Sequence, residues 1–457
     1  MDQQTKVELK EVRRKIYSMI LPITAENILQ MTAGFVSMAM IGRIDKIAIA
    51  ALGLSTRLTQ IIWALFRGIV TGASVFVAQA YGAKDYKKLK KVIQQTLLSS
   101  LILVIIFELI IYIFAPQLLR IFGPSEVLLN NALDYLRIVA LGLPFMAIML
   151  LVAGVLQGMG NAKTPLKIAT IMNFLNIVFS YVLIFGKLSL PALGIKGAAI
   201  GIISAQFIGA LLGLYVLFNK DGVLHSLFNF SFFKLDRKEI AAIYKVGFPS
   251  SMESVFWQIS AIILTTVILS FGETALAAYQ LGLQAEAISY MPAMGFAVAA
   301  TAFVGQCIGA REPEKARKYL KETVKGSIVV TTVSVILFIF FPKLIMRLLT
   351  NDVEVIELGA KYLILMGLVQ IPQNISGLLN GALRGAGFTK VPMIVSGIGI
   401  WGIRVPISLI LTYYFNMNIV AIWAVMCLDL VCRFFISLTI YKRRDIYHSS
   451  ALITEAE

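Results

Sequence analysis

Long apolar stretches constrain the fold of this chain more than any other feature. Twelve of them, each of about 18 to 30 residues, follow one another along the 457 residues. A helix of that length crosses the roughly 30 Å hydrocarbon core of a bilayer, where backbone polar groups must be satisfied within the protein. The sequence therefore predicts an all-α polytopic membrane protein whose transmembrane helices cover 16–41, 47–79, 92–115, 132–158, 164–186, 196–218, 240–270, 274–305, 322–341, 357–383, 390–414 and 419–441.

The charged residues lie mostly between these stretches. They make up only 14% of the chain, and the formal net charge is +16. Most of the 41 Lys and Arg lie in the N-terminal tail, the even-numbered loops and the C-terminal tail. This asymmetry is typical of cytoplasmic segments, so we expect a multi-pass protein of the cell membrane with both termini in the cytoplasm. The basic charge then reflects topology, and we expect no nucleic-acid partner.

Several motifs occur twice, 227 residues apart. Glu26 follows Pro22 by one helical turn, and Glu253 follows Pro249 in the same way. The segment Gln-Ala-Tyr-Gly-Ala at 79–83 returns as Gln-Cys-Ile-Gly-Ala at 306–310, and glycines 154, 158 and 160 return as glycines 381, 385 and 387. The chain is therefore one unit written twice.

The repeat predicts the arrangement of the helices. Six spans per copy is an even number, so both copies insert in the same orientation. We predict two parallel six-helix lobes, related by a pseudo-twofold axis along the membrane normal, with the substrate path between them. The predicted lobes are residues 1–218 and 239–457, and the polar, basic segment 219–238 is predicted to be a cytoplasmic linker along the membrane surface.

Glu26 and Glu253 are the first candidate functional residues. Glu26 lies about 16 Å of helix rise beyond Lys15, and Glu253 lies about 12 Å beyond Lys245. A carboxylate at such depth costs several kcal/mol unless it is neutral, paired or hydrated, and its pKa is easily tuned. Both residues are candidates for the coupling ion, with sodium at either one as an option. The alternative is a protonated carboxyl that only plugs a proline-kinked helix.

Other polar and aromatic residues share helix faces with these acids. Gln30 and Ser37 lie on the stripe of Glu26, where Asn176 and Ser180 of the fifth span can meet them. Trp257 lies one turn after Glu253, and Glu286 and Tyr290 lie one turn apart on the eighth span. An acid beside aromatic rings suits an organic cation, although each ring alone is equally well explained by packing.

The remaining charges within the spans have a structural interpretation. Asp429 and Arg433 are four residues apart on the last span and can pair, with Arg404 as a possible third member. Arg57 and Arg67 of the second span either line the cleft or extend toward the interface. The three cysteines (307, 427 and 432) have unrelated spacings and both histidines lie outside the spans. We therefore expect no metal site, no cofactor and no enzymatic activity.

These motifs resemble those of multidrug and toxic compound extrusion (MATE) transporters. The early prolines of spans one and seven, the Gln-x-x-Gly-Ala ends of spans two and eight, and the glycine-rich turns after spans four and ten carry the resemblance, which covers essentially the whole chain. It implies a V-shaped pair of lobes that exports organic, often cationic compounds in exchange for protons or sodium ions. Many bacterial members have Asp at the positions of Ser37 and Ser180, whereas Gln30 and Asn176 match the family's polar positions.

We therefore predict a secondary active antiporter that exports small organic, cationic compounds or drugs in exchange for protons or sodium ions, working as a monomer in the bilayer. The alternative is a flippase of a lipid-linked saccharide or peptidoglycan precursor, which would need arginines or lysines in the cavity to bind pyrophosphate. The repeated charges are acids, which favours a cation or a neutral drug. Because Ser37 and Ser180 cannot titrate, we predict that coupling depends on Glu253.

Overall fold

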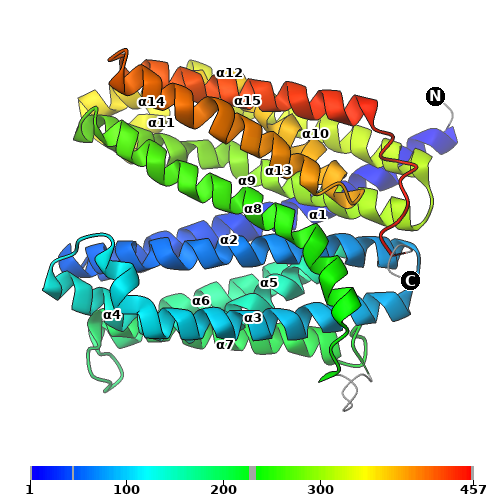
Figure 1. Cartoon of the computed structure of the whole chain (residues 1–457), viewed down its shortest axis with the longest axis horizontal. Coiled ribbons are helices and arrows are strands. Elements are labelled where there is room, and N and C mark those ends of the chain that lie inside the picture. The colour runs from blue at the N-terminus through cyan, green and yellow to red at the C-terminus, as the bar shows by residue number, and fades with distance from the viewer. Residues whose placement is uncertain (1–2, 44–45, 226–232, 454–457) are drawn as a thin grey trace.

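The computed structural model describes residues 3–43, 46–225 and 233–453. In these residues every regular element is a helix (Figure 1). The first group, called the N-half, contains α1 Gln3–Ile41, α2 Lys46–Gly82, α3 Tyr86–Arg120, α4 Glu126–Ala140, α5 Leu143–Gly158, α6 Lys163–Phe185 and α7 Gly194–Phe218. The second group, called the C-half, contains α8 Arg237–Leu269, α9 Glu273–Gly309, α10 Pro313–Phe340, α11 Pro342–Leu349, α12 Val353–Gly385, α13 Lys390–Gly397, η2 Ile398–Arg404, α14 Val405–Tyr413 and α15 Ile419–Arg443.

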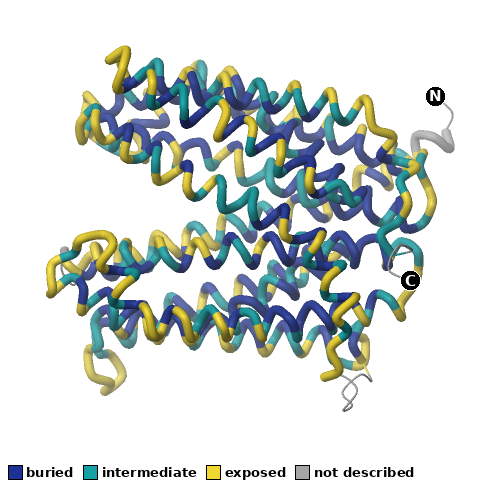
Figure 2. Tube along the Cα trace, viewed as in Figure 1, coloured by how far each residue is buried: buried dark blue, intermediate teal, exposed yellow. Residues whose placement is uncertain are grey.

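The prediction of twelve spans is confirmed. Eleven helical segments of the described chain are long and apolar enough to cross a bilayer, and α4 with α5 forms a twelfth that bends by 49°. Figure 2 shows many exposed positions on the outward surfaces of the helices. Large apolar side chains such as Phe174 and Phe340 are exposed there, as expected for surfaces that face lipid.

Some predicted boundaries were wrong. The span predicted at 132–158 is broken at Leu141–Gly142, because Pro144 begins a new helix there and the chain changes direction. The helix predicted to stop at Pro116 continues to Arg120, with the proline inside it. The span predicted at 390–414 contains a π-helical segment in its middle, η2. Part of the predicted linker, 226–232, lies outside the described residues, and the predicted lobe boundaries stay a prediction.

The two copies of the repeat have the same local geometry. Gly160 and Gly387, 227 residues apart, both adopt positive φ angles, of 86° and 88°. Lys84 and Arg311 form a second such pair, with φ angles of 57° and 56°. Left-handed backbone is uncommon for residues other than glycine, so its recurrence at the same offset indicates that the turns repeat in structure as well as in sequence.

The first helix of each copy packs partly in the other half. Ile16 and Met19 of α1 are buried in the apolar core that α9, α10 and α12 share. The residues at the same offset, Ile243 and Val246 of α8, are buried in the core of α2, α3 and α5. In Figure 1, α8 accordingly begins beside α3 and ends in the layer of the C-half. Each half therefore holds the start of the other half's first helix.

The halves meet most closely at the end of the molecule that holds Gln79 and Gln306, here called the closed end. Nε2 of Gln79 donates a hydrogen bond of 3.0 Å to the carbonyl of Gly385, across the interface. Nε2 of Gln306 makes the equivalent bond, 2.7 Å long, to the carbonyl of Gly158. These are the repeated motifs, and each glutamine binds the glycine-rich turn of the other half.

Ion pairs and the C-terminal segment add contacts at the closed end. Lys88 of α3 pairs with the buried Glu239 of α8 at 2.9 Å, and Arg13 of α1 pairs with Glu322 of α10 at 2.7 Å. Hydrogen bonding to Lys91 lowers the pKa of Asp236, which caps α8. The amide of Leu452 also donates to Oε1 of Gln79. The closed end is thus fixed by contacts that cross between the halves.

The packing at Gly82 generates a prediction. A Cβ at this position would lie 1.9 Å from the carbonyl oxygen of Gln306, whereas a Cβ at Gly53 of the same helix would meet no atom within 4 Å. Gly82→Ala should lower stability by about 1–3 kcal/mol through overpacking. Gly53→Ala should leave it unchanged or raise it, because alanine favours helix. Thermal unfolding of the two purified variants would compare them, and equal melting temperatures would show that the interface is looser.

Candidate functional site

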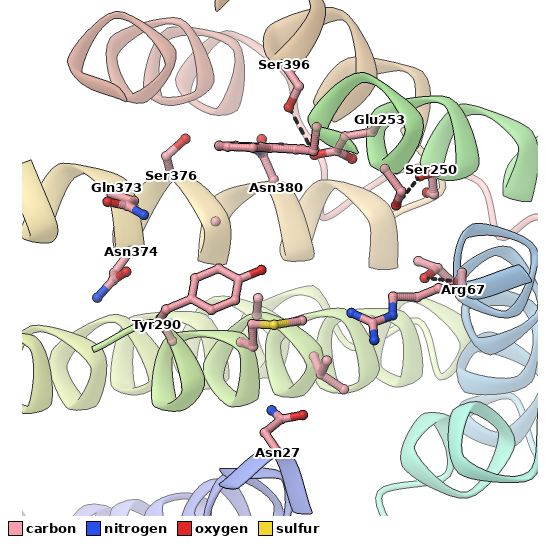
Figure 3. A pocket seen from close by; sticks show the side chains of 18 of the residues that line it. Asn27, Arg67, Ser250, Glu253, Tyr290, Gln373, Asn374, Ser376, Asn380 and Ser396 are labelled. Carbon is pink, nitrogen blue, oxygen red and sulfur yellow. Dashed lines mark hydrogen bonds between the residues drawn. The ribbon is translucent and has the colours of Figure 1, made fainter. Parts of the chain in front are cut away.

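A cavity of about 680 Å³ lies between the two halves. Residues of α1, α2 and α5 line it from the N-half, and residues of α8, α9, α12, α13, η2 and α15 line it from the C-half. Figure 3 shows Glu253, Tyr290 and Arg67 approaching this pocket from different helices. Of the predicted site residues, Glu26, Gln30, Glu253, Trp257, Glu286 and Tyr290 all line it.

Glu253 is held by an ion pair that crosses from α8 to α12. Nη2 of Arg384 lies 2.6 Å from its Oε2, and the hydroxyl of Ser396 donates to Oε1 at 3.1 Å. Both charged side chains are mostly buried, at 12% and 18% exposed. Glu253 therefore does not present a free carboxylate to the cavity. Neutralising it would leave the mostly buried Arg384 without its ion-pair partner.

Glu286 of α9 is held by neutral donors instead. Tyr362 donates its hydroxyl to Oε2 at 2.9 Å, and the side-chain amides of Gln370 and Gln373 donate to Oε1 at 3.1 and 3.2 Å. The carboxylate is 8% exposed, and among the described residues it forms no ion pair. A buried acid without a counter-charge raises the local affinity for a cation.

Asp429 joins two arginines that line the cavity. Its Oδ2 accepts hydrogen bonds from Nε of Arg404 at 2.7 Å and from Nη2 of Arg433 at 2.6 Å. The sequence prediction of this cluster is confirmed. Both guanidinium groups also lie over the ring of Trp257, at 4.8 and 4.6 Å from its centroid. The protein itself thus supplies cations to this ring, for which the sequence left packing and cation binding equally open.

The polar residues of the N-half gather around a second cavity, of about 930 Å³, between α1, α2, α5, α6, α7 and parts of α8 and α9. Glu26, Gln30, Ser37 and Asn176 line it. Ser180 does not line it but donates to Oδ1 of Asn176 at 3.2 Å. Glu26 lies where the two cavities meet, and its Oε2 is buried without a hydrogen-bond partner in the described chain.

The sequence missed the residues that hold the acids. Arg384 lies within a repeated motif, 227 residues after Gln157, and this exchange of an amide for a cation was the available signal. The cavity is also less acidic than the repeated glutamates indicated. Four arginines line the cavity together with three glutamates: Arg67, Arg384, Arg404 and Arg433.

The cluster around Asp429 generates a second prediction. Asp429→Asn leaves two buried guanidinium groups without a counter-charge, so it should destabilise the protein by about 3–5 kcal/mol. Asp134 pairs with Lys196 at 3.0 Å with both side chains about half exposed, and Asp134→Asn should cost at most about 1 kcal/mol. Thermal unfolding in detergent measures both variants. A similar small loss for the two would mean that Asp429 is dispensable for the fold.

Several known proteins resemble this chain over most of its length. A probable multidrug resistance protein NorM of Thermotoga maritima is 30% identical over 439 residues, which cover 94% of this chain and 92% of that protein. A probable multidrug resistance protein YoeA of Bacillus subtilis is 27% identical and covers 90% of this chain and 89% of its own length. Among solved structures, a crystal structure of MATE in the bent conformation matches with a TM-score of 0.88 at 20% identity, over 100% of this chain and 99% of that one.

The repeat appears again in the family comparison. The family model described as MatE matches residues 22–182 and, separately, residues 249–410. The two matches begin 227 residues apart, at the proline of each copy's first helix. The chain therefore belongs to the MatE family, the multidrug and toxic compound extrusion transporters that its repeated motifs resemble.

Proposed function

We propose that this protein is a secondary active antiporter that exports small organic, cationic compounds in exchange for protons or sodium ions. The observation that carries the proposal is the cavity between two repeated halves, which reciprocal contacts close at one end. It contains Glu286, an acid that forms no ion pair within the described part of the chain. Relatives named as probable multidrug resistance proteins support the substrate class. A volume of about 680 Å³ suits a drug-sized molecule.

We place the closed end in the cytoplasm. The basic loops Tyr81–Lys91 and 306–321 lie at this end, and positive charge favours the cytoplasmic side. The two cavities would then open outward in the conformation described, with both termini inside the cell and the protein acting as a monomer of the cell membrane. Export requires a second conformation in which the bonds of Gln79 and Gln306 break and the opposite end closes.

Glu253 is the proposed coupling residue. A proton on its carboxyl group removes the charge that holds Arg384, so protonation loosens the link between α8 and α12. The adjacent guanidinium repels a sodium ion from the same carboxylate. Glu26 has no ion-pair partner in the described chain, and it is the more suitable of the two for sodium. We therefore assign proton coupling to Glu253, with sodium binding at Glu26 as the alternative.

A flippase remains the second candidate, because four arginines line the cavity. Pyrophosphate binding requires cations that are available to it. Three of the four are bound to Glu253 or Asp429, which favours the antiporter. Wild-type protein that moves a lipid-linked pyrophosphate between leaflets, and does not move organic cations, would reverse this choice.

Transport in proteoliposomes tests the proposal. We expect a fluorescent cationic dye to be moved by an imposed proton gradient, with a sodium gradient applied separately for comparison. Glu253→Gln keeps the shape of the side chain and removes its ionisable group, so gradient-driven transport should fall to the level of protein-free liposomes.

Two variants serve as controls. Glu108→Gln changes a partly exposed acid of α3 that lines neither cavity and should transport like wild type. Glu26→Gln should retain more transport than Glu253→Gln. If Glu253→Gln transports normally while Glu26→Gln does not, the N-half couples and the assignment to Glu253 is wrong.

A further inference from the structure

We propose that Arg67 is an anion-binding group of the cavity, so that the protein favours amphoteric substrates that carry a carboxylate as well as a positive charge. This inference rests on the proposed function and names its substrate class more narrowly. Some charged side chains of the cavity have ion-pair partners within the protein, and others do not. The proposal follows from this difference.

Three of the four arginines that line the cavity form ion pairs within the protein. Arg384 is bound to Glu253, and Arg404 and Arg433 are both bound to Asp429. The ring of Trp257 faces the last two guanidinium groups as well. All of these cations are mostly buried, and none is presented to a ligand as a free charge.

Arg67 differs from them. Its side chain is exposed, it lines the cavity, and within the described residues it has no ion pair or side-chain hydrogen bond. Figure 3 shows the guanidinium extending from α2 into the pocket. Glu26 lines the same cavity, but its two oxygens are not within ion-pair distance of Arg67 among the contacts of the described chain. Arg67 is therefore a cation directed at a ligand.

The backbone beneath Arg67 is held in place. At Gly68, a Cβ would lie 2.1 Å from the backbone nitrogen of Ser251, and at Gly72 it would lie 2.5 Å from Gly247. The hydroxyl of Ser251 also donates to the carbonyl of Leu65 at 2.7 Å. The α2–α8 crossing thus fixes the position of Arg67, and a guanidinium so placed can bind a carboxylate through two parallel hydrogen bonds.

Two acids of the cavity, Glu26 and Glu286, form no ion pair among the described residues. Glu286 is the one across the cavity from α2, with neutral donors around it and Tyr290 one turn away. Glu286 projects from α9 of the C-half, whereas Arg67 projects from α2 of the N-half. A ligand with a cation at one end and a carboxylate at the other matches both groups and bridges the two halves. A ligand with only a positive charge leaves Arg67 unneutralised.

A matched pair of dyes tests this inference. Rhodamine B carries a carboxylate beside its cationic ring system, and its ethyl ester keeps the ring system without the carboxylate. Fluorescence anisotropy with purified protein measures the affinity for each dye without any gradient. Wild type should bind the acid more tightly than the ester. Arg67→Gln should weaken binding of the acid about tenfold and leave binding of the ester unchanged or stronger, and Arg67→Lys should retain part of the preference.

Arg137→Gln is the control, since Arg137 is exposed, lies over Tyr112 and does not line either cavity. It should bind both dyes like wild type. Equal losses for acid and ester in Arg67→Gln, or a wild type without preference, would overturn the inference. Binding of the acid through Arg67 without gradient-driven transport of any dye would support the anion site while refuting the antiporter.

Discussion

The close approach of two helix pairs, α2 with α8 and α1 with α9, supports the rest of the structure. Gly68 and Gly72 of α2 bring its backbone against Ser251 and Gly247 of α8. The equivalent crossing places Gly295 of α9 against Ile20 and Thr24 of α1, at the same offset of 227 residues. Small residues allow helices in a membrane to pack this closely. Because the halves are joined here, a cavity can remain between them elsewhere.

The two copies keep their contacts but differ in their charges. The Gln79 and Gln306 bonds are equivalent, as are the exchanged starts of α1 and α8. The positions equivalent to Arg384 and Asp429 are Gln157 and Ile202, and the position equivalent to Arg67 is Met294. Symmetric contacts suit a movement of one half against the other. Because the charges are asymmetric, the C-half contains the ion-paired acid Glu253, whereas the N-half contains the exposed cation Arg67.

The sequence predicted the spans, the repeat and the pair of Asp429 with Arg433, because each depends on local composition or on spacing along one helix. It did not predict the break between α4 and α5 or the partners of Glu253 and Glu286. Arg384 and Tyr362 are 131 and 76 residues away from the acids that they bind, and only helix packing brings them together. The arginines over Trp257 were missed for the same reason.

We expect the two halves to alternate between closing one end of the cavity and closing the other, with Glu253 controlling the change. Distances between spin labels test it most directly, in a background without the three native cysteines. One pair, at Lys87 and Glu314, reports on the closed end, and the other, at Arg43 and Ser270, reports on the opposite end. All four residues are exposed. Acidic pH should lengthen the first distance and shorten the second, and Glu253→Gln should do so at every pH. Distances that stay unchanged at both ends would contradict the account.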